Sequence, residues 1–165
     1  MRLADEHRAL AEELGRRCKE RGLRIATAES CTGGLVAAAI TAIAGSSEWF
    51  ERGFVTYSNE AKREMLGVPP ALIDAHGAVS EPVARAMVEG ALARSSADCA
   101  VSVTGVAGPG GGSAAKPVGM VCFAWQLRGG ASRSATRQLT GDRAEVRGAS
   151  VAVALQGLID RLQSP

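Results

Sequence analysis

Residues 23–44 read LRIATAESCTGGLVAAAITAIA, which is a short apolar run, a polar turn and a longer run of small apolar residues. The run 23–28 is typical of a buried strand, and the run 35–44 is typical of a helix. The octet TAESCTGG at 27–34 therefore predicts a strand-to-helix turn, with Ser30 at the N-terminus of the helix. Unpaired N–H groups and the positive end of the helix dipole favour an anion there, either a phosphate or the oxyanion of an acyl transfer.

Periodicity, capping residues and turn residues place the other elements. Asn59 is a candidate N-cap for a short helix, and Asp142 with Glu145 forms the D-x-x-E pattern of a capping box. We expect helices over residues 3–21, 60–66, 80–94 and 142–162, and strands over residues 53–57, 99–104, 118–127 and 134–139.

The order of these elements predicts an α/β fold with a mostly parallel, mixed five-stranded sheet. Helices separate the first three strands, which favours parallel pairing with helices on both faces. The glycine loop 105–117 contains no helix and residues 128–130 form a short turn, so the strand 118–127 is expected to be the one antiparallel strand. The C-terminal ends of the other four strands then lie at one edge, where open α/β sheets bind ligands.

Length and charge limit the possible classes of protein. A chain of 165 residues fits one domain over residues 1–165. The 19 basic and 17 acidic side chains give a net charge of +2 without a long run of one sign, so we expect no nucleic-acid partner and no binding to an anionic membrane. A small anionic ligand is compatible with this composition.

The N-terminal segment and the cysteines indicate a cytoplasmic protein with free thiols. The start of the chain has no secretory apolar segment, and no stretch approaches the roughly 20 apolar residues of a membrane span. The cysteines at positions 18, 31, 99 and 122 form no C-x-x-C pair. Because the chain has only two histidines, neither a metal site of the zinc type nor a disulfide framework is expected.

Four polar segments are expected to meet at the C-terminal edge of the sheet, at residues 29–34, 57–62, 104–112 and 140–143. Together they supply a serine, a phenol, an amine, a glycine loop and a guanidinium. A serine needs a base to take its proton, and the two histidines lie in other segments, so a lysine is the expected base. We therefore expect a site for nucleophilic chemistry at this edge.

Ser30, Tyr57 and Lys62 form the candidate catalytic group. Lys62 falls in the first turn of its helix, where the dipole disfavours a cation, and a nearby arginine with partial burial would lower its pKa further. Lowering a lysine pKa from about 10.4 to about 7.5 requires roughly 4 kcal/mol, whereas the dipole contributes up to ~1 kcal/mol, so burial must supply most of the effect. Tyr57, the only tyrosine, could pass a proton between the serine, the amine and the leaving group.

Structural explanations stay open for each of these residues. A serine in a strand-to-helix turn often caps the helix, and a lysine in a first helical turn is often solvated. Cys31 is a rival nucleophile or a packing residue, and Glu29 could orient a hydroxyl or cap a backbone amide. Arg143 could bind a phosphate or pair with a neighbouring acidic residue. The loop 105–112 lacks the Walker A and G-x-G-x-x-G patterns, so nucleotide sites of those types are not expected.

Five segments match a known pattern in the same order: TAESCTGG at 27–34, FVTYSNEAK at 54–62, HGAVSEPVA at 76–84, GPGGGSAAKPVG at 108–119 and GDRAEVR at 141–147. Together they resemble the CinA C-terminal domain family, the nicotinamide-nucleotide amidases, over about residues 8–162. The resemblance implies a three-layer α/β/α fold. It also implies hydrolysis of the carboxamide of nicotinamide mononucleotide to nicotinate mononucleotide and ammonia, a step in pyridine nucleotide (NAD) salvage.

The resemblance also assigns roles to individual residues of this chain. It places the nucleophile at Ser30, with Tyr57 and Lys62 in support, and it implies neither a metal nor an organic cofactor. The candidate substrate-binding residues come from the turn, the end of the third strand and the last helix: Cys31, Thr32, Gly33, Thr104, Gly105 and Arg143. The length of the chain resembles the free-standing amidase form of the family.

Other functions and assemblies stay open on the sequence. A non-catalytic module that senses pyridine nucleotides would use the same phosphate contacts without a competent base. A hydrolase for a different amide or ester is a further alternative. Trp49 and Phe50 could form a subunit contact or fill the core, and by analogy with the family we expect a homodimer.

Overall fold

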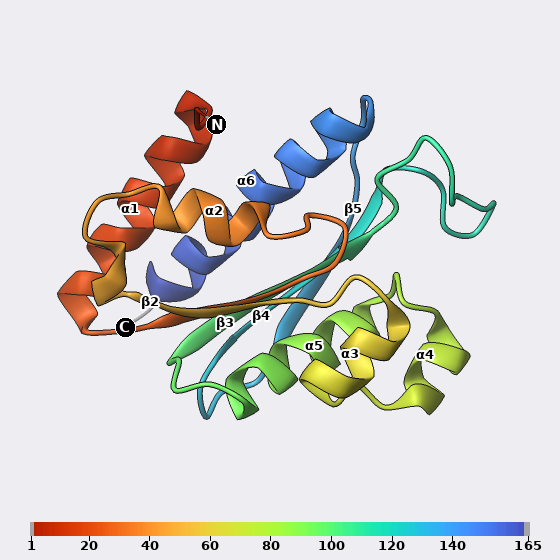
Figure 1. Cartoon of the computed structure of the whole chain (residues 1–165), viewed down its shortest axis with the longest axis horizontal. Coiled ribbons are helices and arrows are strands. Elements are labelled where there is room, and N and C mark those ends of the chain that lie inside the picture. The colour runs from red at the N-terminus through yellow and green to blue at the C-terminus, as the bar shows by residue number, and fades with distance from the viewer. Residues whose placement is uncertain (1, 164–165) are drawn as a thin grey trace.

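A five-stranded sheet in the order β2-β1-β3-β4-β5 forms the centre of the computed structural model, which describes residues 2–163 (Figure 1). β2 and β3 pair in parallel with β1, whereas β4 pairs antiparallel with both β3 and β5. The predicted mixed sheet with one antiparallel strand is therefore confirmed. The strands are β1 (Ile25–Glu29), β2 (Phe50–Val55), β3 (Cys99–Gly105), β4 (Met120–Leu127) and β5 (Arg133–Gln138).

Helices cover both faces of the sheet, so the three-layer α/β/α arrangement is also confirmed (Figure 1). One layer contains α1 (Asp5–Arg21), α2 (Leu35–Thr41) and α6 (Arg143–Gln163), with the 3-10 turn η1 (Ser46–Glu48) after α2. The other layer contains α3 (Asn59–Leu66), α4 (Pro70–His76) and α5 (Glu81–Ala93). Within residues 2–163, no helix combines the length and the apolar character that crossing a bilayer requires.

Buried side chains form a separate core on each face of the sheet. Successive residues of β3 point to opposite faces, so Val101 packs in the core with α1, α2 and α6, whereas Ala100 packs in the core with α5. All five residues of β1 are buried as well. Because both central strands are covered on two sides, their sequences show short, mainly apolar runs instead of a strict alternation of apolar and polar residues.

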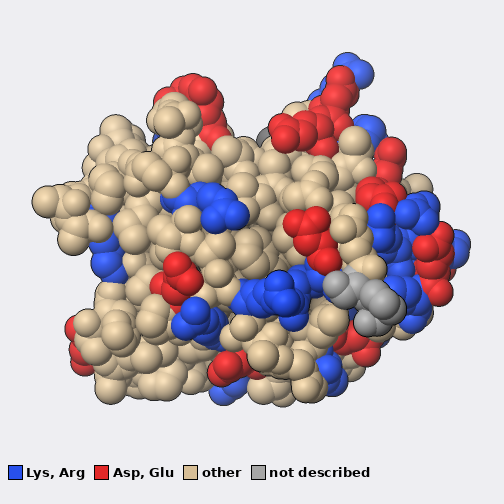
Figure 2. All heavy atoms as spheres, turned by 180° about the vertical axis from the view of Figure 1, so that it is seen from behind, with Lys and Arg blue, Asp and Glu red and all other residues tan. Residues whose placement is uncertain are grey.

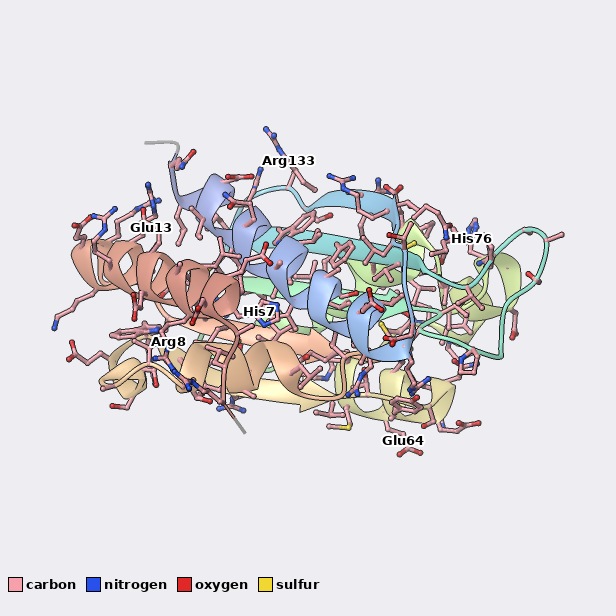
Figure 3. The ribbon with its side chains drawn as sticks, turned by 90° about the horizontal axis from the view of Figure 1, so that it is seen from above. His7, Arg8, Glu13, Glu64, His76 and Arg133 are labelled. Carbon is pink, nitrogen blue, oxygen red and sulfur yellow. The ribbon has the colours of Figure 1, made fainter. Side chains whose placement is uncertain are left out.

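α1 and α6 lie side by side over the sheet (Figure 3). A ring nitrogen of His7 lies 2.8 Å from the carbonyl oxygen of Gly148, and this contact joins the two helices. Trp49 is buried, and its indole occupies the space that a side chain at Gly15 of α1 would need. Trp49 therefore fills the core, which is one of the two alternatives that the sequence left open for it.

Capping interactions define the ends of the helices, and they correct one prediction. Ser58, not Asn59, is the N-cap of α3, because its hydroxyl accepts a hydrogen bond from the amide of Ala61 at 3.0 Å. At the start of α6, the amide of Glu145 donates to Asp142 Oδ1 at 2.9 Å, and the amide of Asp142 donates back to Glu145 Oε1 at 3.4 Å. The predicted capping box is therefore confirmed.

Two elements differ from the sequence prediction because their side chains are largely exposed and so give no clear apolar pattern. α4 is not predicted, because it is a short helix with no buried side chain and so shows no apolar stripe. β2 begins at Phe50, three residues before the predicted start at 53, and it includes the charged Glu51 and Arg52. Because β2 is an edge strand, polar side chains are tolerated there. An apolar pattern therefore does not mark where the strand begins.

Charged side chains of both signs are intermixed on the rear face of the molecule, and large areas between them carry no charge (Figure 2). Several ion pairs join residues i,i+3 or i,i+4 along α1, such as Arg16 with Glu13 and Glu20. The side chains of these pairs are partly or mostly exposed, so each pair contributes little to stability. The face seen in Figure 2 has no extended surface of one sign.

We expect Gly90→Ala to destabilise the fold by about 1–3 kcal/mol, because a methyl group at Gly90 of α5 would overlap the carbonyl oxygen of Leu66 at the end of α3. The free energy of unfolding in urea measures this effect. Gly110→Ala is the matched control, since no atom lies within 4 Å of a methyl group at that position. Equal stability of the two variants would contradict the close packing of α3 on α5.

Candidate active site

The turn after β1 differs from the simple helix start that the sequence predicts. α2 begins only at Leu35, after Gly33 and Gly34, which adopt φ angles of +56° and +104°. The carboxylate of Glu29 accepts hydrogen bonds from the amides of Val36 at 2.9 Å and Ala37 at 3.1 Å. The predicted position of Ser30 at the helix N-terminus is therefore wrong, because a buried glutamate occupies the anion site of the helix.

Backbone hydrogen bonds fix Ser30 between the ends of three neighbouring strands. The amide of Ser30 donates to the carbonyl oxygen of Val103 in β3 at 2.9 Å, and the amide of Thr56 donates to the carbonyl oxygen of Glu29 at 2.8 Å. The parallel ladders thus continue one residue past β1 and β2. This continuation brings the residues that follow β2, including Lys62 in α3, next to the serine.

Lys62 contacts Ser30 directly. Its Nζ lies 3.0 Å from Ser30 Oγ, 2.9 Å from the carbonyl oxygen of Thr56 and 3.4 Å from the carbonyl oxygen of Tyr57. Lys62 is 1% exposed and Ser30 is 8% exposed. The structure thus brings together two of the three residues in the predicted catalytic group, although they are 32 positions apart in the chain.

The environment of Lys62 disfavours its charged form. No carboxylate among residues 2–163 lies within salt-bridge distance of its amine. Burial lowers the pKa of Lys62 below its ordinary value of 10.5, and a nearby thiol, Cys31, acts weakly in the opposite direction. Burial is the main cause of this lowered pKa, as expected from the small contribution that a helix dipole can make. The nearby arginine that the sequence argument invoked is not among the causes.

Three oxygen atoms contact the amine of Lys62. The carbonyl oxygens of Thr56 and Tyr57 can only accept hydrogen bonds, whereas Ser30 Oγ can accept or donate. In the ammonium form each of the three N–H groups has one of these oxygens as its acceptor. In the neutral form the two carbonyl oxygens take the two N–H groups, and the lone pair faces the serine hydroxyl and can take its proton.

Cys31 is a poor competitor for the role of nucleophile. Its side chain is 5% exposed, and burial, with a smaller contribution from Glu29, raises the pKa of its thiol to about 11. A thiol with this pKa is protonated at neutral pH, and the protonated form does not attack. The environment of Cys31 thus favours the packing alternative.

Arg147 in α6 is a feature of the site that sequence reasoning missed. Its Nε donates to the carbonyl oxygen of Cys31 at 3.1 Å, and its Nη2 donates to the carbonyl oxygen of Thr32 at 3.3 Å. Arg147 ends the motif GDRAEVR at 141–147. That position was the one signal of its importance, because its two acceptors lie more than 110 positions away in the chain.

The two hydrogen bonds from Arg147 orient the peptide planes of the turn. In a trans peptide the N–H points away from the C=O, so fixing the carbonyl of Cys31 also fixes the N–H of Thr32. The N–H of Gly33 is taken by the carbonyl oxygen of Ser30 at 3.0 Å. The amides of Cys31, Thr32 and Gly34, in contrast, have no acceptor among residues 2–163. These three amides, close in sequence to the serine, are candidate donors to an oxyanion.

Tyr57 does not take the predicted place between the serine and the lysine. Its carbonyl oxygen faces Lys62, but its side chain is 61% exposed, and Arg143 Nη2 donates to its phenol oxygen at 3.1 Å. Arg143 Nη1 donates to the carbonyl oxygen of Gly108 at 2.8 Å. The three segments that carry these groups therefore meet, and Arg143 pairs with a phenol and a loop carbonyl instead of with a neighbouring acid.

Thr104 and Gly105, both predicted substrate contacts, also have structural roles. The hydroxyl of Thr104 is buried and donates to the carbonyl oxygen of Ala78 at 2.9 Å, so its one donor is already used. Gly105 allows close packing of β3 on β4, since a side chain there would meet Val121. Both residues lie at the end of a central strand, where the sequence alone cannot separate a packing role from a binding role.

Thr32 and Gly33 occupy opposite environments within the turn. The side chain of Thr32 is fully buried, and its hydroxyl has no hydrogen-bond partner among residues 2–163. Gly33 is exposed, and a methyl group there would lie 3.4 Å from Arg147 Nη2. Thr32 is therefore enclosed by the protein, whereas Gly33 leaves room above the turn.

Known proteins resemble this chain over nearly its whole length. The family model of the CinA C-terminal domain matches residues 7–162. The nicotinamide-nucleotide amidohydrolase PncC of Escherichia coli (strain K12) is 55% identical over 149 residues, which are 90% of this chain and 90% of that protein. A CinA-like protein of Mycolicibacterium paratuberculosis is 58% identical over 145 residues, 86% of this chain, and this chain spans 33% of that relative.

A solved structure has the same fold. The competence/damage inducible protein CihA from Agrobacterium tumefaciens superposes with a TM-score of 0.95 at 49% sequence identity, and the match covers 99% of this chain and 100% of that one. At this level of identity the likeness extends beyond the order of the elements to their sequences.

We expect the free energy of unfolding of the wild type, minus that of Lys62→Met, to increase with pH. Because the folded-state pKa of Lys62 lies below 10.5, the unfolded chain binds more protons between the two values, and the free energy of unfolding rises with pH across that window. Lys62→Met removes this titration. Urea unfolding of both proteins at several values between about pH 7 and pH 10 measures the difference.

Ser30→Ala is the control for this series, because it alters the site but keeps the buried amine. Its free energy of unfolding should rise with pH in the same direction as that of the wild type. A difference between the wild type and Lys62→Met that stays constant or falls with pH would contradict a depressed pKa for Lys62.

Proposed function

The chain belongs to the CinA C-terminal domain family, and from this membership we propose that it is a nicotinamide-nucleotide amidase. It hydrolyses the carboxamide of nicotinamide mononucleotide to nicotinate mononucleotide and ammonia, a step in pyridine nucleotide salvage. The observation that carries the proposal is the 3.0 Å contact between Lys62 Nζ and Ser30 Oγ, in a setting that disfavours the ammonium form. A buried serine–lysine pair of this kind is suited to acyl transfer.

In the first half of the reaction Ser30 is acylated. The neutral amine of Lys62 takes the proton of the Ser30 hydroxyl as Oγ attacks the carbonyl carbon of the carboxamide. When the tetrahedral intermediate collapses, the C–N bond breaks, and Lys62 returns the proton to the leaving nitrogen, which departs as ammonia. The product of this half is a nicotinoyl ester on Ser30.

The free amides of the turn stabilise the oxyanion of that intermediate. Cys31, Thr32 and Gly34 carry the N–H groups without an acceptor among residues 2–163, and Arg147 holds the peptide plane to which the Thr32 amide belongs. Donors that are oriented before the reaction need no reorganisation as charge develops, and removing one such donor costs about 10²–10³ in rate. This is a role for the turn that does not depend on the helix dipole, because Glu29 already caps α2.

In the second half water hydrolyses the ester. Lys62 takes a proton from the attacking water, the bond between the acyl carbon and Ser30 Oγ breaks, and Ser30 recovers its proton from Lys62. One water is consumed and one ammonia is released in the full cycle, and both protein groups return to their starting states. Lys62 therefore acts as base and acid in each half.

Arg143 and Tyr57 belong to the binding of the nucleotide in this proposal. Both side chains are exposed, and Arg143 also contacts the glycine loop through Gly108. A guanidinium has five N–H donors, and the two contacts described use two of them, so a phosphate can bind the same group bidentately. Holding the phosphate fixes the position of the amide relative to Ser30.

We expect Ser30→Ala to lower ammonia release from nicotinamide mononucleotide by about 10⁴-fold or more, because the acyl-enzyme can no longer form. Cys31→Ala tests the rival nucleophile and should keep most of the activity, since its thiol is buried and protonated. A coupled assay for ammonia measures both variants. Full activity of Ser30→Ala would exclude the serine, and a wild type that binds the nucleotide without releasing ammonia would favour a sensor module.

We expect Arg147→Ala to lower kcat by about 10²-fold with a smaller change in KM, because the turn loses its orientation while the binding groups stay in place. Arg147→Lys should recover only part of the rate, since one ammonium cannot reproduce both guanidinium contacts. Added guanidinium ions at millimolar concentration should partly restore Arg147→Ala. Arg85→Ala, which removes an exposed arginine of α5, is the control. An unchanged kcat in Arg147→Ala would contradict the positioning role.

A further inference from the structure

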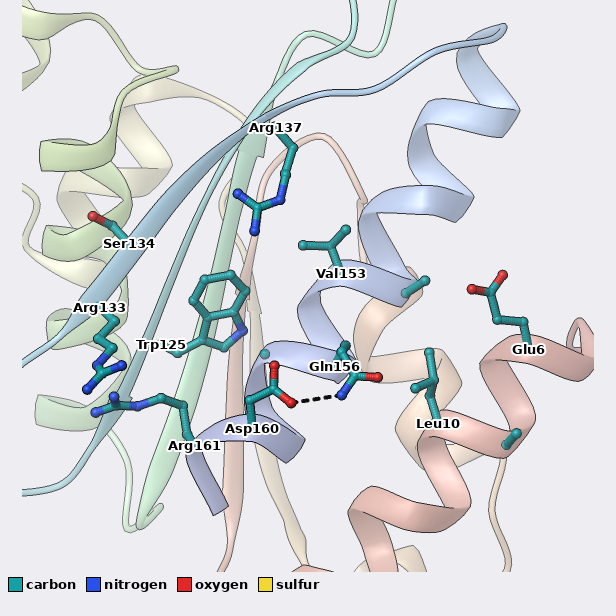
Figure 4. A pocket seen from close by; sticks show the side chains of 13 residues that line it. Glu6, Leu10, Trp125, Arg133, Ser134, Arg137, Val153, Gln156, Asp160 and Arg161 are labelled. Carbon is teal, nitrogen blue, oxygen red and sulfur yellow. Dashed lines mark hydrogen bonds between the residues drawn. The ribbon is translucent and has the colours of Figure 1, made fainter. Parts of the chain in front are cut away.

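A cavity with a volume of about 680 Å³ lies away from the candidate active site, between α1, α6 and the strands β4 and β5 (Figure 4). Its lining residues come from the start of α1, the second half of α6 and the outer part of the sheet, and they include none of the residues of the candidate active site. The proposed amidase function makes no use of this cavity. Its volume is within the range of about 300–1,000 Å³ that is typical of small-molecule sites.

The floor of this cavity is apolar and rigid. Trp125 of β4 is 7% exposed, and its indole N–H donates to the carbonyl oxygen of Ala154 at 3.0 Å. Gly157 allows α6 to approach this ring, because any side chain at that position would overlap the indole. Val153 of α6 and Leu10 of α1 form an apolar wall on one side of this ring (Figure 4). A flat or apolar part of a ligand can therefore rest on a fixed surface.

Three arginines surround the floor: Arg133 and Arg137 from β5 and Arg161 from α6 (Figure 4). None of them lies within salt-bridge distance of a carboxylate among residues 2–163. Their hydrogen bonds are sparse, since Arg137 contacts only the carbonyl oxygen of Thr136 at 3.3 Å and Arg161 contacts only that of Ala131 at 3.4 Å. The guanidinium groups are thus available to an anion.

Arg161 gives a second indication of a missing anion. Its Nε is buried and has no hydrogen-bond partner within residues 2–163. Burial and the neighbouring charge of Arg133 both lower the pKa of Arg161, which means that its positive charge is poorly compensated. A buried donor without an acceptor is costly, and an anionic oxygen at this place would remove that cost.

The two acidic residues of the cavity do not supply this compensation. Asp160 accepts a hydrogen bond from Gln156 at 2.9 Å, and Figure 4 shows this pair on the α6 side of the cavity. Glu6 lies on α1, at the opposite wall from β5. Arg133 and Arg161 lie next to each other on one side of Trp125, and Arg137 lies on the other side of the ring (Figure 4).

We propose that this cavity binds an organic phosphate of about mononucleotide size, with its phosphate on Arg133 and Arg161, its flat body against Trp125 and Arg137 beside the opposite edge of that body. Guanidinium forks match the geometry of phosphate oxygens, and two adjacent ones suit a multiply charged anion. The apolar floor favours a ligand with an aromatic body over a free inorganic ion. The proposal does not rest on the amidase function, since it concerns a separate set of residues.

Fluorescence of Trp125 tests the proposal with ADP as the probe. The chain has two tryptophans, so Trp49→Phe leaves Trp125 as the only one. We expect ADP to change this fluorescence saturably, with a Kd below about 1 mM. Pyrophosphate should bind at least tenfold more weakly because it lacks the flat body, and adenosine should not bind because it lacks the phosphates.

Two sets of substitutions locate the binding. Arg133→Gln combined with Arg137→Gln should weaken ADP binding at least tenfold, and both side chains are exposed, so the fold should tolerate the change. Arg143→Gln is the matched control at the candidate active site and should leave the Trp125 signal intact. The rise in Tm with ADP in proteins that keep Trp49 provides a second measurement, because a ligand that binds only the folded state stabilises it.

Three results would overturn the proposal. The first is the lack of any ADP effect at 10 mM, roughly tenfold above the expected Kd, in both measurements. The second is binding that the double arginine variant leaves unchanged. The third is binding that is lost in Arg143→Gln, which would place the nucleotide in the amidase site instead.

Discussion

A lysine amine buried without a carboxylate partner is the constraint on which the rest of this structure depends. Removing an ammonium group from water is unfavourable, so the fold must surround Lys62 with acceptors or leave it neutral. The two carbonyl oxygens of Thr56 and Tyr57 and the hydroxyl of Ser30 provide three contacts for the amine. The same contacts that make the burial tolerable also direct the lone pair of the neutral form at the serine. Stability and reactivity therefore have one origin at this point of the molecule.

The turn that carries the serine is held at two places by charged side chains that do not themselves react. Glu29 satisfies the first amides of α2, and Arg147 holds the carbonyl oxygens of Cys31 and Thr32. The sequence predicts that one helix N-terminus both positions Ser30 and binds an anion. In the structure these two roles belong to different groups. The helix is capped by a carboxylate, and the amides left over in the turn are free to stabilise a developing negative charge.

Helix α6 links the two ends of the molecule where anions are expected. Its first turns carry Arg143 and Arg147 at the candidate active site, and its last turns carry Arg161 at the cavity lined by Trp125. A helix rises 1.5 Å per residue, so these positions are on the order of 20 Å apart along one rigid element. The similarity to a nicotinamide-nucleotide amidohydrolase supports the role of the candidate active site. The proposed anion site around Trp125 is inferred from arginines that have no carboxylate partner among residues 2–163.

The sequence by itself determined the order of the elements along the chain, the single antiparallel strand β4, the capping box of Asp142 and Glu145, and the choice of Ser30 and Lys62 as candidates. These features depend on local periodicity and on the rule that strand ends meet at one edge of the sheet. Only the tertiary structure decided which role each side chain plays at that edge. In the folded chain the Tyr57 phenol is exposed and contacts Arg143. The Thr104 hydroxyl donates to a backbone carbonyl oxygen, and Arg147 contacts the turn after β1. Such roles follow from contacts between residues that are distant in the chain, and no local pattern encodes which of several polar groups reaches a given partner first.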